Sequence, residues 1–206
     1  MGSQRHPLCL TPTTNYYLLK DFLYRELCRE SWSPLLMNHD FLHGLQLRYA
    51  VFYTELCVEC ISDWNLAPQE VLFSSGRKCS NMLFVASGEV FYSTSSSSTR
   101  RTAEQPIHGK DFHTVMPSDD LQLIDQTLGP GDWLCEQCLW TPWHYRGRAE
   151  SLAGATMLCL SDDKLQKAAS VHKEVATELV VYARLFVSAL NAALSDGLSD
   201  LPIVLP

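Results

Sequence analysis

Apolar side chains recur at helical spacing near both ends of the chain. Residues 16–32 place such side chains on roughly one face of a helix, which Pro34 is expected to end. A second helical stretch covers residues 41–56 and is expected to break near Gly44. Ser161-Asp162-Asp163 is a typical N-cap sequence and introduces a long C-terminal helix. The apolar stripe of that helix consists of Val171, Val175, Leu179, Tyr182, Phe186 and Leu190.

The central part of the chain, residues 59–160, has a different pattern. Short apolar runs alternate with turn residues, and Gly76, Gly88 and Gly131 are expected to lie at turns between strands. The expected strands are residues 70–73, 82–86, 89–93, 121–128 and 156–160. Many short strands with frequent turns are typical of a sandwich or barrel. The predicted fold is therefore α+β: a β-roll or jelly-roll-like barrel with N-terminal helices and two C-terminal helices.

These patterns divide the chain into three parts. Residues 1–56 form an N-terminal tail and helical segment, residues 57–197 form the barrel with its C-terminal helices, and residues 198–206 form a tail. Within the barrel, residues 93–120 open with a serine-rich run and break the strand pattern. Such a polar segment buries too little apolar area to offset the entropy of ordering, which predicts an exposed and flexible insertion.

Composition narrows the class of protein. The 206 residues are 46% hydrophobic and 19% charged, as in an ordinary globular protein, and the net charge of -7 gives no sign of a nucleic-acid-binding face. The longest apolar tract, residues 179–194, is interrupted by Arg184 and Asn191, so no membrane span is expected. The N-terminal residues lack a signal peptide, and we expect a cytoplasmic protein with reduced cysteines.

The most informative segment is residues 128–149, LGPGDWLCEQCLWTPWHYRGRA. Preceded by Ser87-Gly88-Glu89-Val90, its Gly131-Asp132, Glu136 and Leu139 follow an order that resembles the cyclic-nucleotide-binding domain family. The resemblance covers about residues 34–194. It implies a non-enzymatic regulatory module with cAMP or cGMP as ligand and no other cofactor. Residues 139–143 and the N-terminal helices look most like the cytosolic tail of a cyclic-nucleotide-gated, hyperpolarisation-activated or ether-à-go-go channel, which implies a channel subunit or another protein as partner.

The resemblance also implies a ligand site. A short helix after Gly131-Asp132 would direct free N–H groups at the phosphate, Glu136 would accept a hydrogen bond from the ribose hydroxyl, and an arginine would neutralise the phosphate. The implied ligand-binding residues are Cys135, Glu136, Gln137, Cys138, Arg146 and Arg148. Two positions depart from the family pattern, because Cys135 replaces a glycine and Tyr145 stands where the family has its arginine.

Other interpretations of these residues remain open. Glu136 can be a first-turn helix acid, and the two arginines can be surface charges. A non-binding scaffold would keep the barrel and fill the pocket with a side chain, for which Trp140 and Trp143 are the candidates. The Cys-x-x-Cys pairs at Cys57/Cys60 and Cys135/Cys138 are too far apart for a zinc ribbon and are expected to be buried thiols. The sequence contains no nucleophile elbow, phosphate loop or metalloprotease helix, so no enzyme and no metal are expected.

Overall fold

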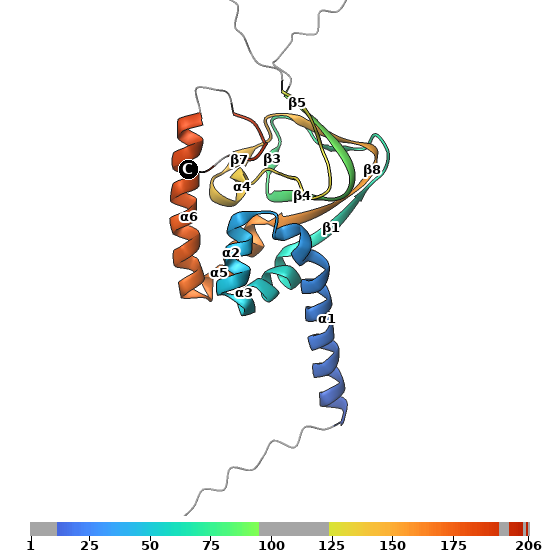
Figure 1. Ribbon diagram of the computed structural model, residues 1–206, viewed down its shortest axis with the longest axis vertical. Helices are drawn as coiled ribbons and strands as arrows, with labels where there is room; N and C mark the ends of the chain where they lie inside the picture. Colours follow the sequence, from blue (N-terminus) through green and yellow to red (C-terminus); the bar gives the residue numbers. More distant parts are fainter. Residues whose placement is uncertain (1–11, 95–123, 194–197, 204, 206) are drawn as a thin grey trace, which may run out of the picture.

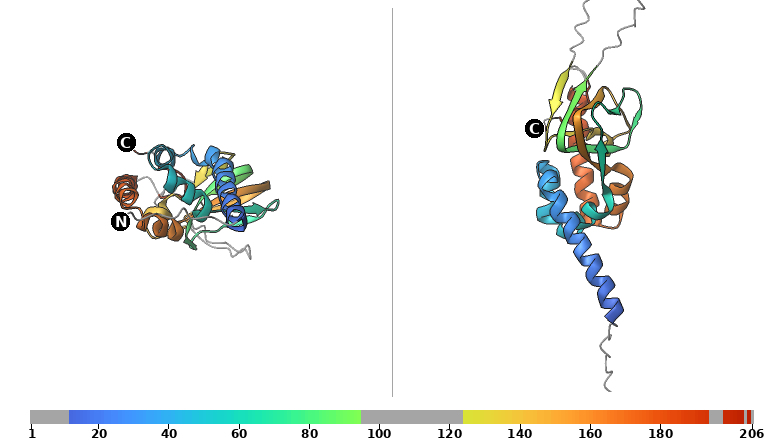
Figure 2. Two further views of the ribbon diagram at one scale, coloured as in Figure 1. Left: turned by 90° about the horizontal axis from the view of Figure 1, so that it is seen from below. Right: turned by 90° about the vertical axis from the view of Figure 1, so that its right-hand side faces the viewer.

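The computed structural model describes residues 12–94, 124–193, 198–203 and 205, with side chains from residue 19 onward. A β-sheet lies at one end of the molecule, and most of the helices pack below and beside it (Figure 1). Helix α6 runs along one side of this body, while α1 projects away from it (Figures 1 and 2). One hydrophobic core joins the helices to the sheet.

Six of the eight strands in the described part of the chain form one antiparallel sheet. Its main path is β1-β8-β4-β5, with β2 paired to β8 and β6 paired to β4. Strands β3 and β7 form a separate two-stranded ribbon. The strands are β1 (Ile61–Leu66), β2 (Val71–Phe73), β3 (Lys78–Cys79), β4 (Asn81–Ser93), β5 (Asp125–Leu128), β6 (Trp133–Leu134), β7 (Trp143–His144) and β8 (Arg148–Ser161).

The α+β class is confirmed, but the prediction of a barrel is wrong. The end strands β1 and β5 do not pair with each other in the part of the chain that the structure describes. Register shifts interrupt the pairing of β4 with β8 on both sides of Gly88, and such irregularities bend a sheet. The sheet is therefore curved but open. The β3–β7 ribbon does not pair with either end strand and so does not close it.

The N-terminal region is mainly helical, as predicted. It contains α1 (Pro12–Leu36), α2 (Asp40–Arg48), α3 (Ala50–Glu55) and a π-helical turn, η1 (Leu56–Cys60). Two predicted boundaries are wrong. Pro34 lies inside α1, two residues before its end, and Gly44 lies inside α2, so the break falls at Tyr49.

The C-terminal helices are α4 (Gln137–Trp140), α5 (Asp162–Ser170) and α6 (Lys173–Ala192). Ser161 caps α5 as predicted, with its side chain accepting a hydrogen bond from the Lys164 N–H at 3.4 Å. The predicted stripe of α6 is also present, because Val175, Leu179, Phe186 and Leu190 are buried. Val171, the first residue predicted for the stripe, lies before α6 and is exposed.

Of the three glycines predicted at turns, Gly76 and Gly131 lie there. The prediction for Gly88 is wrong, because this residue lies inside β4 and the predicted strands 82–86 and 89–93 are one strand. Gly88 has a φ of +78°, and a Cβ there would lie 2.1 Å from the Gly154 carbonyl oxygen. Close approach of β8, rather than a turn, accounts for this glycine.

The predicted insertion, residues 93–120, lies mostly outside the described residues, which resume at residue 124. At the other end of the chain, the structure describes residues 198–203, which we call the C-terminal strap. The strap returns from the end of α6 to the β3–β7 side of the sheet (Figure 1). Leu198, Leu201 and Ile203 pack against the core, and Asp200 between them is buried.

Candidate functional site

The chain turns sharply between β6 and α4. Cys135 is fully buried and has a φ of +66°, in the left-handed region that favours glycine. This turn lets the chain leave the strand and begin α4 at Gln137, close to the position at which the sequence predicted a short helix. The position at which the resembled family pattern has glycine is therefore one where the backbone conformation of this chain favours glycine.

Glu136 is held by three side chains from different parts of the fold. It is 3% exposed, and its Oε2 atom lies 3.0 Å from His39 Nε2 at the corner between α1 and α2. Its Oε1 atom accepts hydrogen bonds from Trp140 Nε1 at 3.2 Å and from the Tyr182 hydroxyl of α6 at 2.9 Å. Burial and the Glu136 charge raise the pKa of Tyr182, which keeps this hydroxyl a donor. The Glu136 carboxylate, which the resemblance predicts to bind a ribose hydroxyl, is therefore bound to side chains of the protein itself.

The Asp200 carboxylate of the strap lies in a nest of donors. Its Oδ2 atom accepts hydrogen bonds from the backbone N–H groups of Arg146 at 2.8 Å and Gly147 at 2.9 Å, and from the Tyr92 hydroxyl at 3.1 Å. Its Oδ1 atom accepts Trp143 Nε1–H at 2.7 Å. Asp200 is fully buried, and burial raises the pKa of its carboxyl group while the four donors oppose that rise. The four donors therefore form an anion-binding site that the chain's own Asp200 carboxylate occupies.

The strap backbone is also fixed to the segment around α4. The Cys135 N–H donates to the Asp200 carbonyl at 2.7 Å, and the Asp200 N–H donates to the Tyr92 hydroxyl at 3.0 Å. The Gln137 side-chain amide donates to the carbonyls of Ser199 at 3.1 Å and Leu201 at 2.9 Å. Two of the predicted ligand residues, Cys135 and Gln137, therefore bind the chain's own C-terminal segment.

The two predicted arginines do not converge on one anion through their side chains. The Arg146 guanidinium lies 4.8 Å from the ring centre of Trp143, and only its backbone N–H binds Asp200. Arg148 pairs with Glu150 at 2.6 Å on the exposed start of β8. Tyr145, where the family has arginine, stacks on Phe73 with ring centres 4.0 Å apart. Backbone N–H groups and an indole therefore supply the donors that the resemblance assigns to arginine.

Sequence reasoning missed Asp200, Tyr92 and Gly147 as parts of this site. Trp143 had been proposed as a pocket filler, but it is a donor to the residue that fills the site. The one available signal was the position of Asp200, an acid directly before the apolar run LPIVLP of residues 201–206. Nothing local connects that acid to residues 92 or 143, because the contacts span 108 and 57 positions.

A cluster of buried thiols lies beside the strap. The side chains of Cys135 and Cys138 hydrogen-bond to Cys79, and these contacts lower the pKa of Cys79. Burial raises the pKa of Cys135, and the contact with Cys79 raises that of Cys138. Cys57 and Cys60, the other Cys-x-x-Cys pair, are buried free thiols in η1. Among the described residues no group of three or more His, Cys, Asp or Glu side chains is arranged to hold a metal ion.

One described helix, α6, is long and apolar enough to cross a membrane by length and composition alone. The same helix contributes Val175, Leu179, Phe186 and Leu190 to the core, as the core helix of a globular protein does. Tyr182 lies between these residues, stacked on Phe41 with ring centres 3.9 Å apart. One face of the helix therefore packs on the core, while Val180, Val181 and Leu185 on its other faces are exposed.

No protein-family model matches this sequence, and the comparison with curated proteins found no match. Among solved structures, the sensor domain of the transcriptional regulator DNR from Pseudomonas aeruginosa is similar over 86% of this chain and 99% of that domain, with 15% identity and a TM-score of 0.53. The C-linker/CNBHD of zELK channels is similar over 62% of this chain and 59% of that one, with 18% identity and a TM-score of 0.40. PKAR CBD2 bound to Sp-2Cl-cAMPS is similar over 78% of this chain and 90% of that one, with 11% identity and a TM-score of 0.45.

The similarity to the DNR sensor domain is a similarity of fold, because 15% of the residues are identical. Together with an antiparallel sheet that N-terminal helices precede and C-terminal helices follow in the chain, it confirms the predicted cyclic-nucleotide-binding-domain-like fold. The matched structures are thus the sensor domain of one transcriptional regulator, the N-terminal domain of another from Streptomyces coelicolor A3(2), the C-linker/CNBHD of zELK channels and PKAR CBD2. What the present chain binds is a separate question, which depends on its own residues.

Proposed function

We propose that this chain is a regulatory module, not an enzyme, in which the C-terminal strap takes the place of a cyclic nucleotide. The observation that carries the proposal is the buried Asp200 carboxylate with its four donors. A carboxylate and a phosphate both satisfy N–H groups that converge on an anion. These donors lie next to α4, where the sequence resemblance implies the phosphate site.

The remaining contacts of the site favour a seated strap over a bound nucleotide. A nucleotide would have to displace the Asp200 carboxylate and also the strap backbone that Cys135 and Gln137 hold. The strap competes as a tethered ligand, since it follows α6 closely in the chain, and short tethers give effective concentrations on the order of millimolar. Glu136 offers no free oxygen to a ribose unless His39, Trp140 and Tyr182 give up their contacts.

The proposal makes cAMP and cGMP ligands of the opened module only. Titration of either nucleotide, followed by tryptophan fluorescence and by calorimetry, tests this with three chains: the wild type, Asp200→Ala and Ser199→Ala. Ser199→Ala is the matched control, because the Ser199 carbonyl binds Gln137 while its side chain makes only a local contact with the Leu201 N–H at 3.3 Å. We expect no binding by the wild type or by Ser199→Ala at 1 mM (about -4 kcal/mol), and binding by Asp200→Ala.

Two results separate this proposal from its alternatives. Micromolar binding by the wild type would show that the strap does not occupy the nucleotide's place. Failure of Asp200→Ala to bind, with a cooperative melting transition that shows it folded, would favour the second candidate, a scaffold that has lost its ligand. The buried contacts of Glu136 are the observation that favours that candidate.

A module of this kind acts on another chain or domain that responds to the seated or released strap. A cytoplasmic channel subunit remains our predicted partner, on the sequence resemblance of residues 139–143 and the N-terminal helices. Recording the currents of a cyclic-nucleotide-gated channel with the wild type or with Asp200→Ala co-expressed tests this prediction. Currents that are the same with both chains and with neither would contradict it.

A further inference from the structure

Helix α1 exposes large apolar side chains where it leaves the body of the protein. Leu19, Phe22, Leu23 and Leu27 are 57%, 58%, 56% and 64% exposed. The far end of the same helix is different, because Ser33 and Leu36 are buried against the body. Figure 2 shows the projecting part of α1 extending away from the other helices. About half of this helix therefore presents an apolar surface that the described chain does not cover.

The exposed residues share one side of the helix. Leu19, Leu23 and Leu27 are four positions apart, and Phe22 follows Leu19 by three, so these side chains form a stripe. We call Leu19, Phe22, Leu23 and Leu27 the α1 stripe. A stripe of this spacing is what one helix presents to another in a two-helix seam.

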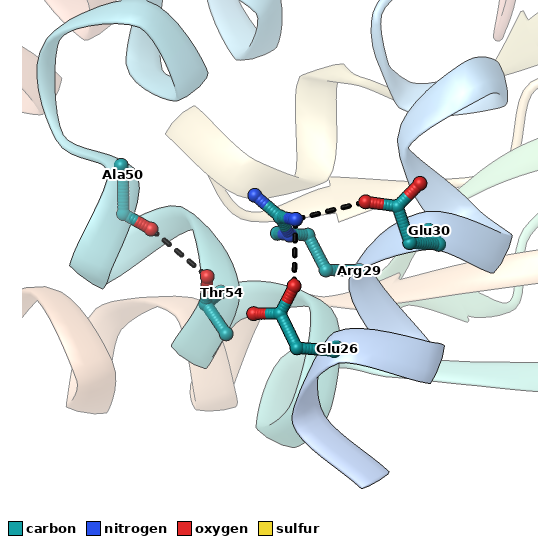
Figure 3. A network of polar contacts seen from close by, with 5 residues as sticks. All are labelled: Glu26, Arg29, Glu30, Ala50 and Thr54. Carbon is teal, nitrogen blue, oxygen red and sulfur yellow. Dashed lines mark hydrogen bonds and ion pairs between the residues drawn. The ribbon is translucent and has the colours of Figure 1, made fainter. Parts of the chain in front are cut away.

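The charged residues around the α1 stripe neutralise one another. Arg25 pairs with Asp21 at 2.9 Å. Arg29 pairs with Glu26 at 2.7 Å and with Glu30 at 2.8 Å, as Figure 3 shows. With Lys20, residues 19–30 contain three basic and three acidic side chains, whereas the whole chain has a net charge of -7. Other faces of two copies would therefore repel each other, while the α1 segment carries no net charge.

We propose that the α1 stripe binds the α1 stripe of a second copy of this chain, with the two helices antiparallel and a two-fold axis at Leu23. Residue numbers that sum to 46 then lie at the same level along the seam. Leu19 of one copy is level with Leu27 of the other, so leucine meets leucine along the stripe.

The antiparallel direction also keeps the two bodies apart. Each body joins α1 near Ser33, ten positions from Leu23, or about 15 Å along the helix at 1.5 Å per residue. The two bodies then lie at opposite ends of the helix pair. A parallel pair would bring both bodies to the same end of the helix pair.

Sedimentation equilibrium of the full chain over about 1–100 μM tests the assembly. We expect a reversible dimer in the wild type, and at least ~100-fold weaker dimerisation in Leu23→Glu, because two carboxylates then face each other at the axis. Leu47→Glu is the matched control: Leu47 is a helical leucine that is 75% exposed on α2, away from the stripe. It should change the dimer dissociation constant less than ~3-fold.

Cysteine cross-linking of full-length variants tests the direction of the helices. Leu23→Cys should form a disulfide-linked dimer under mild oxidation, as should a mixture of Leu19→Cys and Leu27→Cys, whereas Leu19→Cys alone should not exceed the wild type with its native cysteines. A monomeric wild type at 100 μM would overturn the proposal and leave the stripe to another protein or a lipid surface. A dimer that Leu23→Glu leaves intact would overturn it as well, and efficient cross-linking of Leu19→Cys alone would overturn the antiparallel geometry. None of these outcomes depends on nucleotide binding.

Discussion

Replacing Glu136 with alanine should destabilise the protein strongly, although the residue lies in a segment first interpreted as a ligand site. The substitution leaves His39 Nε2, Trp140 Nε1 and the Tyr182 hydroxyl without their acceptor. Each buried donor left unpaired costs about 1–3 kcal/mol, and hydrogen bonds to a charged group lie at the upper end. Allowing for local relaxation, we expect a loss of about 4–6 kcal/mol in the free energy of unfolding.

Urea unfolding followed by tryptophan fluorescence measures this loss directly, and calorimetry gives the matching change in Tm. For a domain of this size a loss of about 5 kcal/mol corresponds to a decrease in Tm of ~10–20 °C. Glu136→Gln keeps the volume and one oxygen acceptor, so it should lose about 1–3 kcal/mol and stay folded. Glu89→Ala, at an exposed position of β4, is the control and should change stability by less than about 0.5 kcal/mol.

A small loss of stability in Glu136→Ala would contradict the buried arrangement. If Glu136 only caps the first turn of α4 at the surface, its removal should cost about 0.3–1 kcal/mol. A Glu136→Ala protein within about 1 kcal/mol of Glu89→Ala would therefore refute the buried three-donor arrangement.

Three further predictions concern the backbone turns and the strap. Gly88→Ala should destabilise the protein by several kcal/mol, since its Cβ would lie 2.1 Å from the Gly154 carbonyl oxygen. Gly76→Ala, at φ +83° with open space around it, should cost about 1–2 kcal/mol. Denaturant midpoints compare the two variants, and equal losses would contradict the close approach of β8. Cys135→Gly removes the unfavourable left-handed cysteine but leaves the Asp200 carbonyl in place, so it should give no nucleotide affinity at 1 mM on its own, and calorimetric binding by this variant would contradict the strap as occupant. Burial raises the pKa of Asp200 above its ordinary 3.8, so the folded protein holds this proton more tightly than the unfolded chain does. The resulting stability is fully present below about pH 3.8 and is lost as the pH rises through the folded pKa. Asp200→Asn should remove this part of the pH dependence, and parallel stability–pH curves for the two proteins would contradict it.

The sequence predicted those features of the fold that neighbouring residues determine. The N-cap at Ser161, the buried face of α6 and the turns at Gly76 and Gly131 depend on side chains within a few positions of each other. Strand β1 was missed because its residues Ser62 to Asn65 are all exposed, which removes the apolar alternation that marks a strand. Proline at position 34 predicts a helix end because its ring and missing N–H disfavour a helix interior, but α1 continues two residues beyond it.

The candidate site was predictable only in part, for the same reason. Cys135 and Gln137 were identified from the local order of motifs, and both contact the occupant of the site. The occupant itself could not be found in this way, because Asp200 is distant in sequence from each of its donors. Sequence patterns record which residues can form an anion site, whereas the identity of the anion depends on where a remote segment packs.

The position of Glu136 between three helical segments has a mechanical consequence. His39 marks the base of α1, and Tyr182 lies on α6, the helix that leads into the strap, so one carboxylate couples the two ends of the chain. Helix α1 has 25 residues and about half of them project from the body, which makes a lever arm about 19 Å long. A tilt of about 5° where the helix leaves the body would move its tip by about 2 Å. A displacement of α6 too small to alter the core would therefore become a visible swing at the far end of α1.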